Sequence, residues 1–143
     1  HFYGFDKAVN DNKTIEINAD AKFCKFCKTP YEYNFVTYNH LGDFYCPNCG
    51  YKRSDLMYAV TDIIDINADS STIKFNDLEV SINQSGTYNI YNGVCAYSIA
   101  KELGIADSAI KKSLENQSSS FGRQETINIE GKDVKIFLVK KSV

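Results

Sequence analysis

Apolar and polar residues alternate along two short runs, residues 72–75 and 78–82, on either side of an Asn-Asp pair at 76–77. Alternation with a period of two places one set of side chains on a covered face, and an Asn-Asp gap suits a tight turn, so the pattern predicts a β-hairpin. The β-branched and aromatic run at 56–66 predicts another strand, and residues 2–5 predict a short buried one. Together these runs predict a small antiparallel sheet with one covered face.

Further along the chain the spacing of apolar residues changes from two to three or four. Residues 89–103 predict a first helix that ends at Gly104, because glycine readily adopts the positive φ that stops a helix. Asp107 is the predicted N-cap of a second helix. A last hairpin is predicted from residues 124–129 and 134–139. Strands and helices together predict an α/β fold.

Length and composition are those of one ordinary globular domain. The chain has 143 residues, of which 43% are hydrophobic and 24% charged. Its net charge of -2 argues against a nucleic-acid-binding protein. No apolar run approaches the roughly 20 residues of a membrane-spanning helix.

Four of the five cysteines form two Cys-x-x-Cys pairs, Cys24/Cys27 and Cys46/Cys49, separated by a strand-and-turn sequence. Folding this segment back on itself would bring the pairs into a tetrahedral S4 zinc site, which predicts a zinc ribbon at residues 22–53. The alternatives are two disulfides or buried free thiols. Disulfides are typical of oxidising compartments, and a structural zinc contributes about 10–16 kcal/mol against about 2–4 kcal/mol for a disulfide. Free thiols and zinc indicate a reducing, cytoplasmic setting.

The lysines and arginine of the ribbon and the fifth cysteine are interpreted as structural residues without a chemical role. The ribbon is locally basic, which we interpret as a solvated face that also stabilises thiolates; the residues are Lys22, Lys25, Lys28, Lys52 and Arg53. Cys95 lies beside the apolar stripe of the first helix and is predicted to be a small core residue rather than a nucleophile. Thiol oxidoreductase chemistry is disfavoured, because two pairs that share one metal would quench it.

Two further segments are candidates for nucleotide contacts. Asn89 and Asn92 stand three residues apart at the start of the first helix, where carboxamides could pair with the donor and acceptor of an adenine edge. The alternative is that Asn89 only caps the helix. Arg123, beside a glycine in a polar loop, could reach a phosphate or ribose, although most surface arginines are simply solvated.

In order and spacing, three stretches resemble the central ATP-binding domain of the Mur ligase superfamily. They are the Cys24-x-x-Cys27…Cys46-Pro-Asn-Cys49-Gly50 ribbon, GTYNIYNGVCAYSIAKELGI and FGRQETINIEGKDVKIFLVK. The inserted ribbon is typical of the MurT-like branch of that superfamily, the synthetase subunits of lipid II isoglutaminyl synthase. The resemblance implies that residues 1–21 and 54–143 form the second half of a central domain, and that 22–53 are an inserted zinc ribbon.

The same resemblance implies ATP and Mg²⁺ as cofactors, with Asn89 and especially Asn92 near the adenine and Arg123 on the nucleotide. It implies amidation of the α-carboxylate of D-glutamate in the lipid II stem peptide to D-isoglutamine, during peptidoglycan synthesis. Ammonia would come from a GatD glutaminase partner, and the enzyme would work in the cytoplasm at the inner face of the membrane.

The chain contains no Gly-x-x-x-x-Gly-Lys-Ser/Thr phosphate loop, begins with His1 instead of methionine, and ends in Lys141-Ser142-Val143 where the family continues with Asn-Pro. These features predict a fragment of a longer ligase, inactive alone, with the phosphate loop upstream and a catalytic C-terminal domain downstream. The alternative is a stand-alone zinc-ribbon interaction module.

Overall fold

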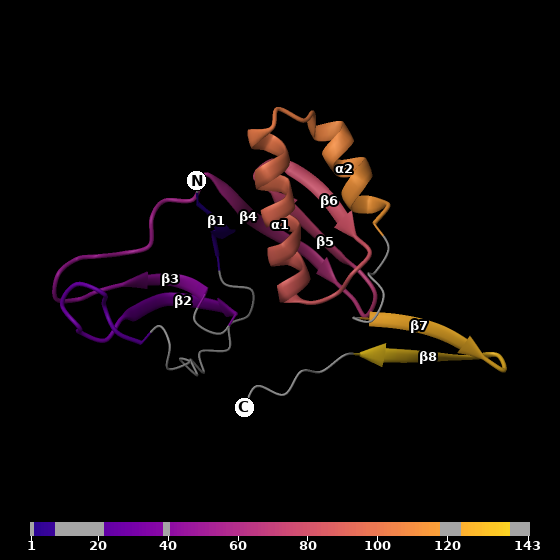
Figure 1. Ribbon diagram of the computed structural model, residues 1–143, viewed down its shortest axis with the longest axis horizontal. Helices are drawn as coiled ribbons and strands as arrows, with labels where there is room; N and C mark the ends of the chain where they lie inside the picture. Colours follow the sequence, from indigo (N-terminus) through magenta and orange to yellow (C-terminus); the bar gives the residue numbers. More distant parts are fainter. Residues whose placement is uncertain (1, 8–21, 39–40, 118–123, 138–143) are drawn as a thin grey trace.

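The computed structural model describes residues 2–7, 22–38, 41–117 and 124–137. In these residues the chain forms a four-stranded sheet covered by two helices, and two separate two-stranded hairpins (Figure 1). One hairpin carries the cysteine pairs and the other lies near the end of the chain. The predicted α/β class, with two helices and small sheets, is confirmed.

The four-stranded sheet has the order β1-β4-β5-β6. Its strands are β1 (Tyr3–Phe5), β4 (Tyr58–Ile66), β5 (Ser71–Phe75) and β6 (Leu78–Ile82). The hairpin of β5 and β6 turns at residues 76–77 as predicted, and Asn76 adopts the positive φ of 51° that such a turn uses. The Asn76 carboxamide also accepts a hydrogen bond from the Ala59 N–H at 2.8 Å and thereby fastens the turn to β4.

One strand differs from the predicted antiparallel arrangement. β1 pairs parallel with β4, in the register Tyr3 to Tyr58, so the sheet is mixed. Parallel neighbours need a long crossover connection, and here the crossover contains the cysteine-bearing ribbon. Alternation within β1 cannot reveal this, because the direction of a strand depends on the connection and not on its own sequence.

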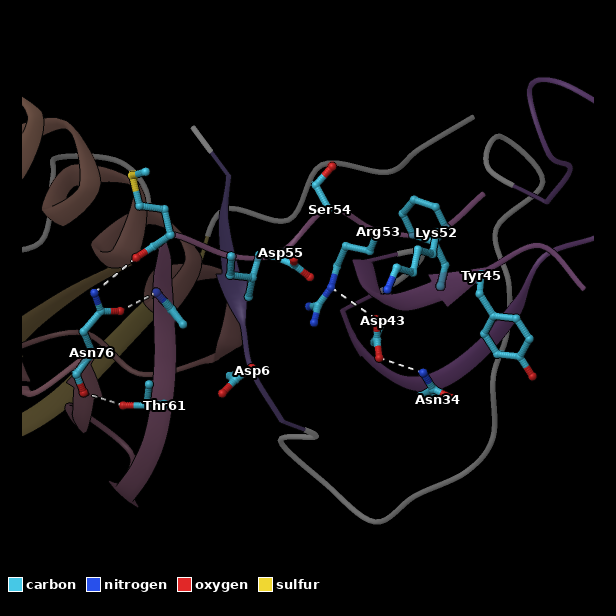
Figure 2. Close-up of a pocket in the computed structure, with 14 residues that line it drawn as sticks. Asp6, Asn34, Asp43, Tyr45, Lys52, Arg53, Ser54, Asp55, Thr61 and Asn76 are labelled. Atoms are coloured by element: carbon cyan, nitrogen blue, oxygen red, sulfur yellow. Dashed lines mark hydrogen bonds and ion pairs between the residues drawn. The ribbon is translucent and has the colours of Figure 1, made fainter. Parts of the chain in front are cut away.

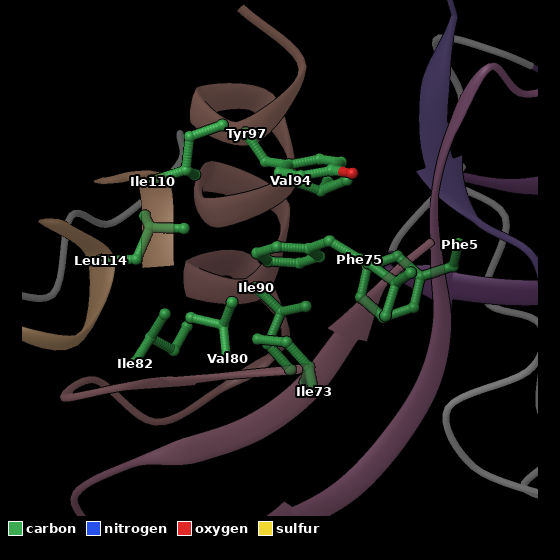
Figure 3. Close-up of a cluster of buried hydrophobic side chains, with 11 residues drawn as sticks. Phe5, Ile73, Phe75, Val80, Ile82, Ile90, Val94, Tyr97, Ile110 and Leu114 are labelled. Atoms are coloured by element: carbon green, nitrogen blue, oxygen red, sulfur yellow. The ribbon is translucent and has the colours of Figure 1, made fainter. Parts of the chain in front are cut away.

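The two helices pack on one face of the sheet (Figure 3). α1 (Thr87–Glu102) crosses it closely, since a Cβ added to Gly93 would lie 3.0 Å from the Phe75 ring. α2 (Asp107–Glu115) covers the β6 edge. The buried core is Phe5, Val60, Ile73, Phe75, Val80, Ile82, Ile90, Val94, Tyr97, Ile110 and Leu114.

The end of α1 agrees with the prediction, whereas the start of α2 does not. Gly104 has a φ of 75° directly after the end of α1, as predicted. The predicted cap Asp107 is wrong, because Ala106 is the N-cap and Asp107 is the first helical residue. The Asp107 carboxylate instead accepts a hydrogen bond from Lys101 Nζ at 2.7 Å, which ties the two helices together.

The two hairpins are β2 (Glu32–Tyr38) with β3 (Leu41–Tyr45), and β7 (Gln124–Ile129) with β8 (Lys132–Phe137). In the first, Gly42 is required, because a Cβ there would lie 2.2 Å from the Phe35 carbonyl oxygen. The second turns tightly at residues 130–131, both with positive φ, so β8 begins two residues before its predicted start; its predicted end at 138–139 lies outside the described residues. No helix among the described residues is long and apolar enough to cross a membrane.

Candidate metal centre

Two turns of nearly the same geometry carry the cysteine pairs. In the first, the Cys24 N–H donates to the Thr29 carbonyl at 2.8 Å and the Lys28 N–H donates to the Cys24 carbonyl at 2.9 Å. In the second, the Cys46 N–H donates to the Tyr51 carbonyl at 2.7 Å and the Gly50 N–H donates to the Cys46 carbonyl at 3.0 Å. Each turn is thus closed by the same two backbone bonds.

Both turns need a positive φ at the residue after the second cysteine. Gly50 has a φ of 74°, as expected of a glycine in a metal knuckle, and Lys28 has a φ of 62° in the equivalent place. A lysine there gave no sequence signal for the turn, because side chains other than Gly, Asn and Asp rarely adopt this conformation.

The turns bring the four thiol groups together. The Sγ atoms of Cys24, Cys27, Cys46 and Cys49 all lie within 4.8 Å of one another. The distances between the pairs are 3.5 Å from Cys24 to Cys49 and 3.4 Å from Cys27 to Cys46. Sulfur atoms at 2.3 Å from a tetrahedral zinc would be about 3.8 Å apart, so the four groups are placed as the ligands of one metal ion require. All four are free thiols, not disulfides.

The thiols are in unequal environments. A hydrogen bond with the Thr29 hydroxyl, supported by the Thr29 backbone, lowers the pKa of Cys27 to about 5. At Cys49 the Tyr51 backbone N–H lowers the pKa, but burial and the neighbouring thiols outweigh it and raise the value to about 12. Backbone N–H groups directed at sulfur stabilise thiolates, which is the form that binds a metal.

The cysteine-bearing hairpin is attached to the sheet mainly through Arg53. The Arg53 Nε lies 3.3 Å from Asp43 Oδ1 (Figure 2). The Arg53 Nη1 donates a hydrogen bond to the Phe5 carbonyl at 2.7 Å. The guanidinium also lies 5.5 Å from the centre of the Phe35 ring. The expectation that Arg53 belongs to a solvated face is therefore wrong, because its side chain is only 20% exposed.

A second attachment comes from α1. The hydroxyl groups of Tyr91 and Thr37 form a hydrogen bond, and the Tyr91 ring lies 4.6 Å from the Phe5 ring. Two hollows flank this junction. One is a largely aromatic cavity of about 230 Å³, and the other is a polar pocket of about 670 Å³ that contains Arg53 and Asp43 (Figure 2). Periodicity could not reveal the junction, since its residues come from separate elements.

The candidate nucleotide residues have different surroundings. Asn89 is only 7% exposed, and its Nδ2 donates a hydrogen bond to the Ser85 carbonyl at 2.7 Å. Asn92 is exposed one turn further along α1. Arg123 lies outside the described residues. Gly86, not Asn89, is the N-cap of α1, so capping does not explain Asn89.

The fifth cysteine is separate from the four clustered thiols. Cys95 is half-buried on α1, and a hydrogen bond with it raises the pKa of Tyr3. It is absent from the cluster of four thiols.

Comparison with known proteins places these features in context. The chain is 33% identical over 142 residues to the MurT subunit of lipid II isoglutaminyl synthase (glutamine-hydrolyzing) from Streptococcus pneumoniae, covering 99% of this chain and 32% of that protein. It is 28% identical to the MurT subunit from Staphylococcus aureus over 97% of this chain and 31% of the relative. A shorter match, 43% identical over 49 residues, is to UDP-N-acetylmuramate–L-alanine ligase from a Janthinobacterium strain, covering 34% of this chain and 10% of the enzyme. No family model matches the chain.

The fold has a solved counterpart. A pseudomurein peptide ligase type C from Methanothermus fervidus matches 96% of this chain and 27% of its own with a TM-score of 0.70, at 24% sequence identity. The chain spans about a third of the length of the curated relatives it matches. Over nearly its whole length, the chain is therefore similar to MurT-type Mur ligases, and the predicted resemblance is confirmed.

Proposed function

We propose that this chain is part of an ATP-dependent carbon–nitrogen ligase that amidates the α-carboxylate of D-glutamate in the lipid II stem peptide, giving D-isoglutamine. The observation that carries the proposal is the similarity to MurT subunits across 99% of the chain. The names of those relatives state glutamine hydrolysis, so ammonia would come from a glutaminase subunit, GatD. The reaction would take place in the cytoplasm, at the inner face of the membrane that carries the lipid-linked substrate.

ATP and Mg²⁺ would supply the driving force for replacing a carboxylate oxygen by nitrogen. From this chain we assign Asn92 to the adenine edge, because its carboxamide is exposed at the start of α1 and can donate and accept at once. Asn89 would hold the preceding turn through Ser85, and Arg123 would contact phosphate or ribose. The 143 residues contain no phosphate loop, so we expect the chain alone neither to hydrolyse ATP nor to amidate lipid II.

The four clustered cysteines would hold a structural Zn²⁺. Sulfur spacing close to a tetrahedron, backbone N–H groups directed at the thiols and the absence of disulfides among them all fit a closed four-thiolate site. Residues 22–53 would be a zinc ribbon inserted into the second half of the central domain, made of residues 1–21 and 54–143. The ion would stabilise the two knuckles and take no part in the reaction.

A chimera tests the proposed reaction. In the Streptococcus pneumoniae MurT subunit, the matching segment is replaced by this chain, and the protein is assayed with GatD, glutamine, ATP and lipid II by mass spectrometry of the stem peptide. We expect amidated product from the chimera and none from the isolated chain. A folded chimera that binds GatD but forms no amide would contradict the proposal and favour an interaction module instead. The unmodified subunit is the matched control.

A further inference from the structure

The cysteine end of the ribbon presents aromatic rings and lysines to solvent. Phe26 is 67% exposed and Phe23 is 52% exposed, although large apolar side chains are usually covered. We call this surface the ribbon tip; it consists of Phe23, Phe26, Tyr51, Lys22, Lys25, Lys28 and Lys52. In Figure 1 the knuckle ends of β2 and β3 point away from the helices and the four-stranded sheet. The ribbon tip is thus an outer end of the described molecule.

The exposed rings are held in place. The Phe26 ring packs edge-on against Tyr51 with a centroid distance of 5.0 Å. The Lys25 ammonium lies 5.0 Å from the centre of Phe26 and 4.7 Å from that of Tyr51. Lys22 lies 5.8 Å from the centre of Phe23. Each exposed ring of the tip therefore carries a cation on a face, and the aromatic groups form an ordered surface.

The charge of the tip differs from that of the chain. The segments 22–31 and 46–53 contain five basic and no acidic residues, whereas the whole chain has a net charge of -2. Arg53 is engaged by Asp43, but none of the four lysines forms an ion pair with another described residue. A four-thiolate zinc would carry two negative charges that nearby lysines offset. That role explains some of the cations, but it leaves the exposure of Phe23 and Phe26 without a cause.

We propose that the ribbon tip docks on the surface of an anionic bilayer. Lysine ammonium groups would contact lipid phosphates while the phenyl rings enter the boundary between headgroups and acyl chains. The inference rests on the proposed function, because a lipid-linked substrate brings the enzyme to such a surface. Binding through the tip is weak and reversible by itself, and it adds to the affinity for the substrate through effective concentration.

Single-stranded nucleic acid is the other partner that combines phosphates with aromatic contacts. Bases need a free ring face on which to stack. Here Lys25 occupies faces of Phe26 and Tyr51, and Lys22 occupies one of Phe23. The observations favour the bilayer.

A single tryptophan tests the contact directly, because the chain contains no tryptophan. The zinc-loaded Phe26→Trp chain is mixed with vesicles of phosphatidylglycerol and phosphatidylcholine, without ATP or lipid II. We expect its emission to shift to the blue and to be quenched by brominated acyl chains, with little change on pure phosphatidylcholine. The control is Leu103→Trp, at a side chain 73% exposed beyond α1, whose emission should not change. Unchanged emission at position 26, or equal shifts at both positions, overturns the proposal.

Charge variants test the lysines. Each lysine near an anionic surface changes affinity about fivefold, so Lys25→Gln/Lys28→Gln should weaken vesicle binding about 25-fold and reduce its dependence on salt. The control pair Lys111→Gln/Lys112→Gln on α2 should change it less than twofold. Zinc content and circular dichroism identify any variant that fails to fold, and Phe26→Trp then remains the deciding measurement. Tighter binding of single-stranded DNA than of vesicles, with competition between them, contradicts the proposal. With lipid II supplied in detergent micelles, the amidation assay contains no bilayer, so loss of vesicle binding leaves its result unchanged and the two proposals fail separately.

Discussion

Replacing Arg53 by alanine should detach the ribbon from the sheet while leaving the candidate metal centre intact. The substitution removes a charge-assisted hydrogen bond to the Phe5 carbonyl at 2.7 Å, a contact at 3.3 Å to Asp43, and packing on Phe35. A hydrogen bond of a charged group contributes about 1.5–3 kcal/mol, and a partly exposed ion pair contributes about 0.5 kcal/mol. We therefore expect the free energy of unfolding to fall by about 2–4 kcal/mol.

Hydrogen exchange and urea unfolding of the zinc-loaded chain measure this effect. Exchange should increase most at β1 and along β2 and β3, whereas the zinc content stays at one ion per chain. Arg53→Lys should recover only part of the loss, because an ammonium cannot reach the Phe5 carbonyl and Asp43 with the geometry of a guanidinium. The control is Lys52→Ala at the neighbouring exposed position. The role assigned to this side chain would be refuted if Arg53→Ala lowered the free energy of unfolding by less than about 0.5 kcal/mol, or if the variant lost its zinc.

Three further outcomes are expected. Cys46→Ser should abolish stoichiometric zinc binding and raise hydrogen exchange mainly between residues 23 and 53. The control, Cys95→Ser, should leave the zinc content found by elemental analysis unchanged. A uniform loss of exchange protection in Cys46→Ser would show that the ribbon and the sheet share one core. If Asn92 reads the adenine edge as proposed, Asn92→Ala in the MurT chimera should weaken ATP binding by about 1–3 kcal/mol and relax discrimination against GTP in steady-state kinetics. An unchanged ATP/GTP ratio would exclude base recognition. Gly42→Ala should disrupt the ribbon hairpin, because its Cβ would lie 2.2 Å from a backbone oxygen; an unchanged melting temperature by circular dichroism would disprove that constraint.

Local patterns predicted those parts of the fold that local forces determine. Alternation around residues 76–77 located the hairpin of β5 and β6, because turn geometry and side-chain period act over a few residues. Helical spacing located α1, and Gly104 located its end. The Cys-x-x-Cys pairs predicted the candidate metal centre. Each pair holds two thiols on one short turn, so bringing the two turns together is enough to assemble four ligands.

Contacts between residues far apart in the sequence could not be predicted in this way. The parallel pairing of β1 with β4 depends on the long connection between the two strands, which contains the ribbon. The position of Arg53 depends on a carbonyl of Phe5, which is distant in sequence and carries no side-chain signature. The start of α2 also differs from the prediction by one residue, because Ala106 is the N-cap and the Asp107 side chain pairs with Lys101 on the preceding helix, a contact that local sequence does not indicate.

The crossover between β1 and β4 has a consequence for the order of folding. Two strands joined by residues 6–57 form a pair of high contact order, which closes slowly compared with the neighbouring hairpins. A folded ribbon at residues 22–53 would remove 32 of these 52 residues, about three fifths, from the free chain. Shortening the loop from 52 to 20 residues lowers its closure cost by only about 0.8 kcal/mol. The saving in loop-closure entropy is therefore too small to explain how β1 joins the sheet. The Arg53 contact is larger, so we expect a folded ribbon to carry the first strand to the edge of a sheet that β4, β5 and β6 have already formed.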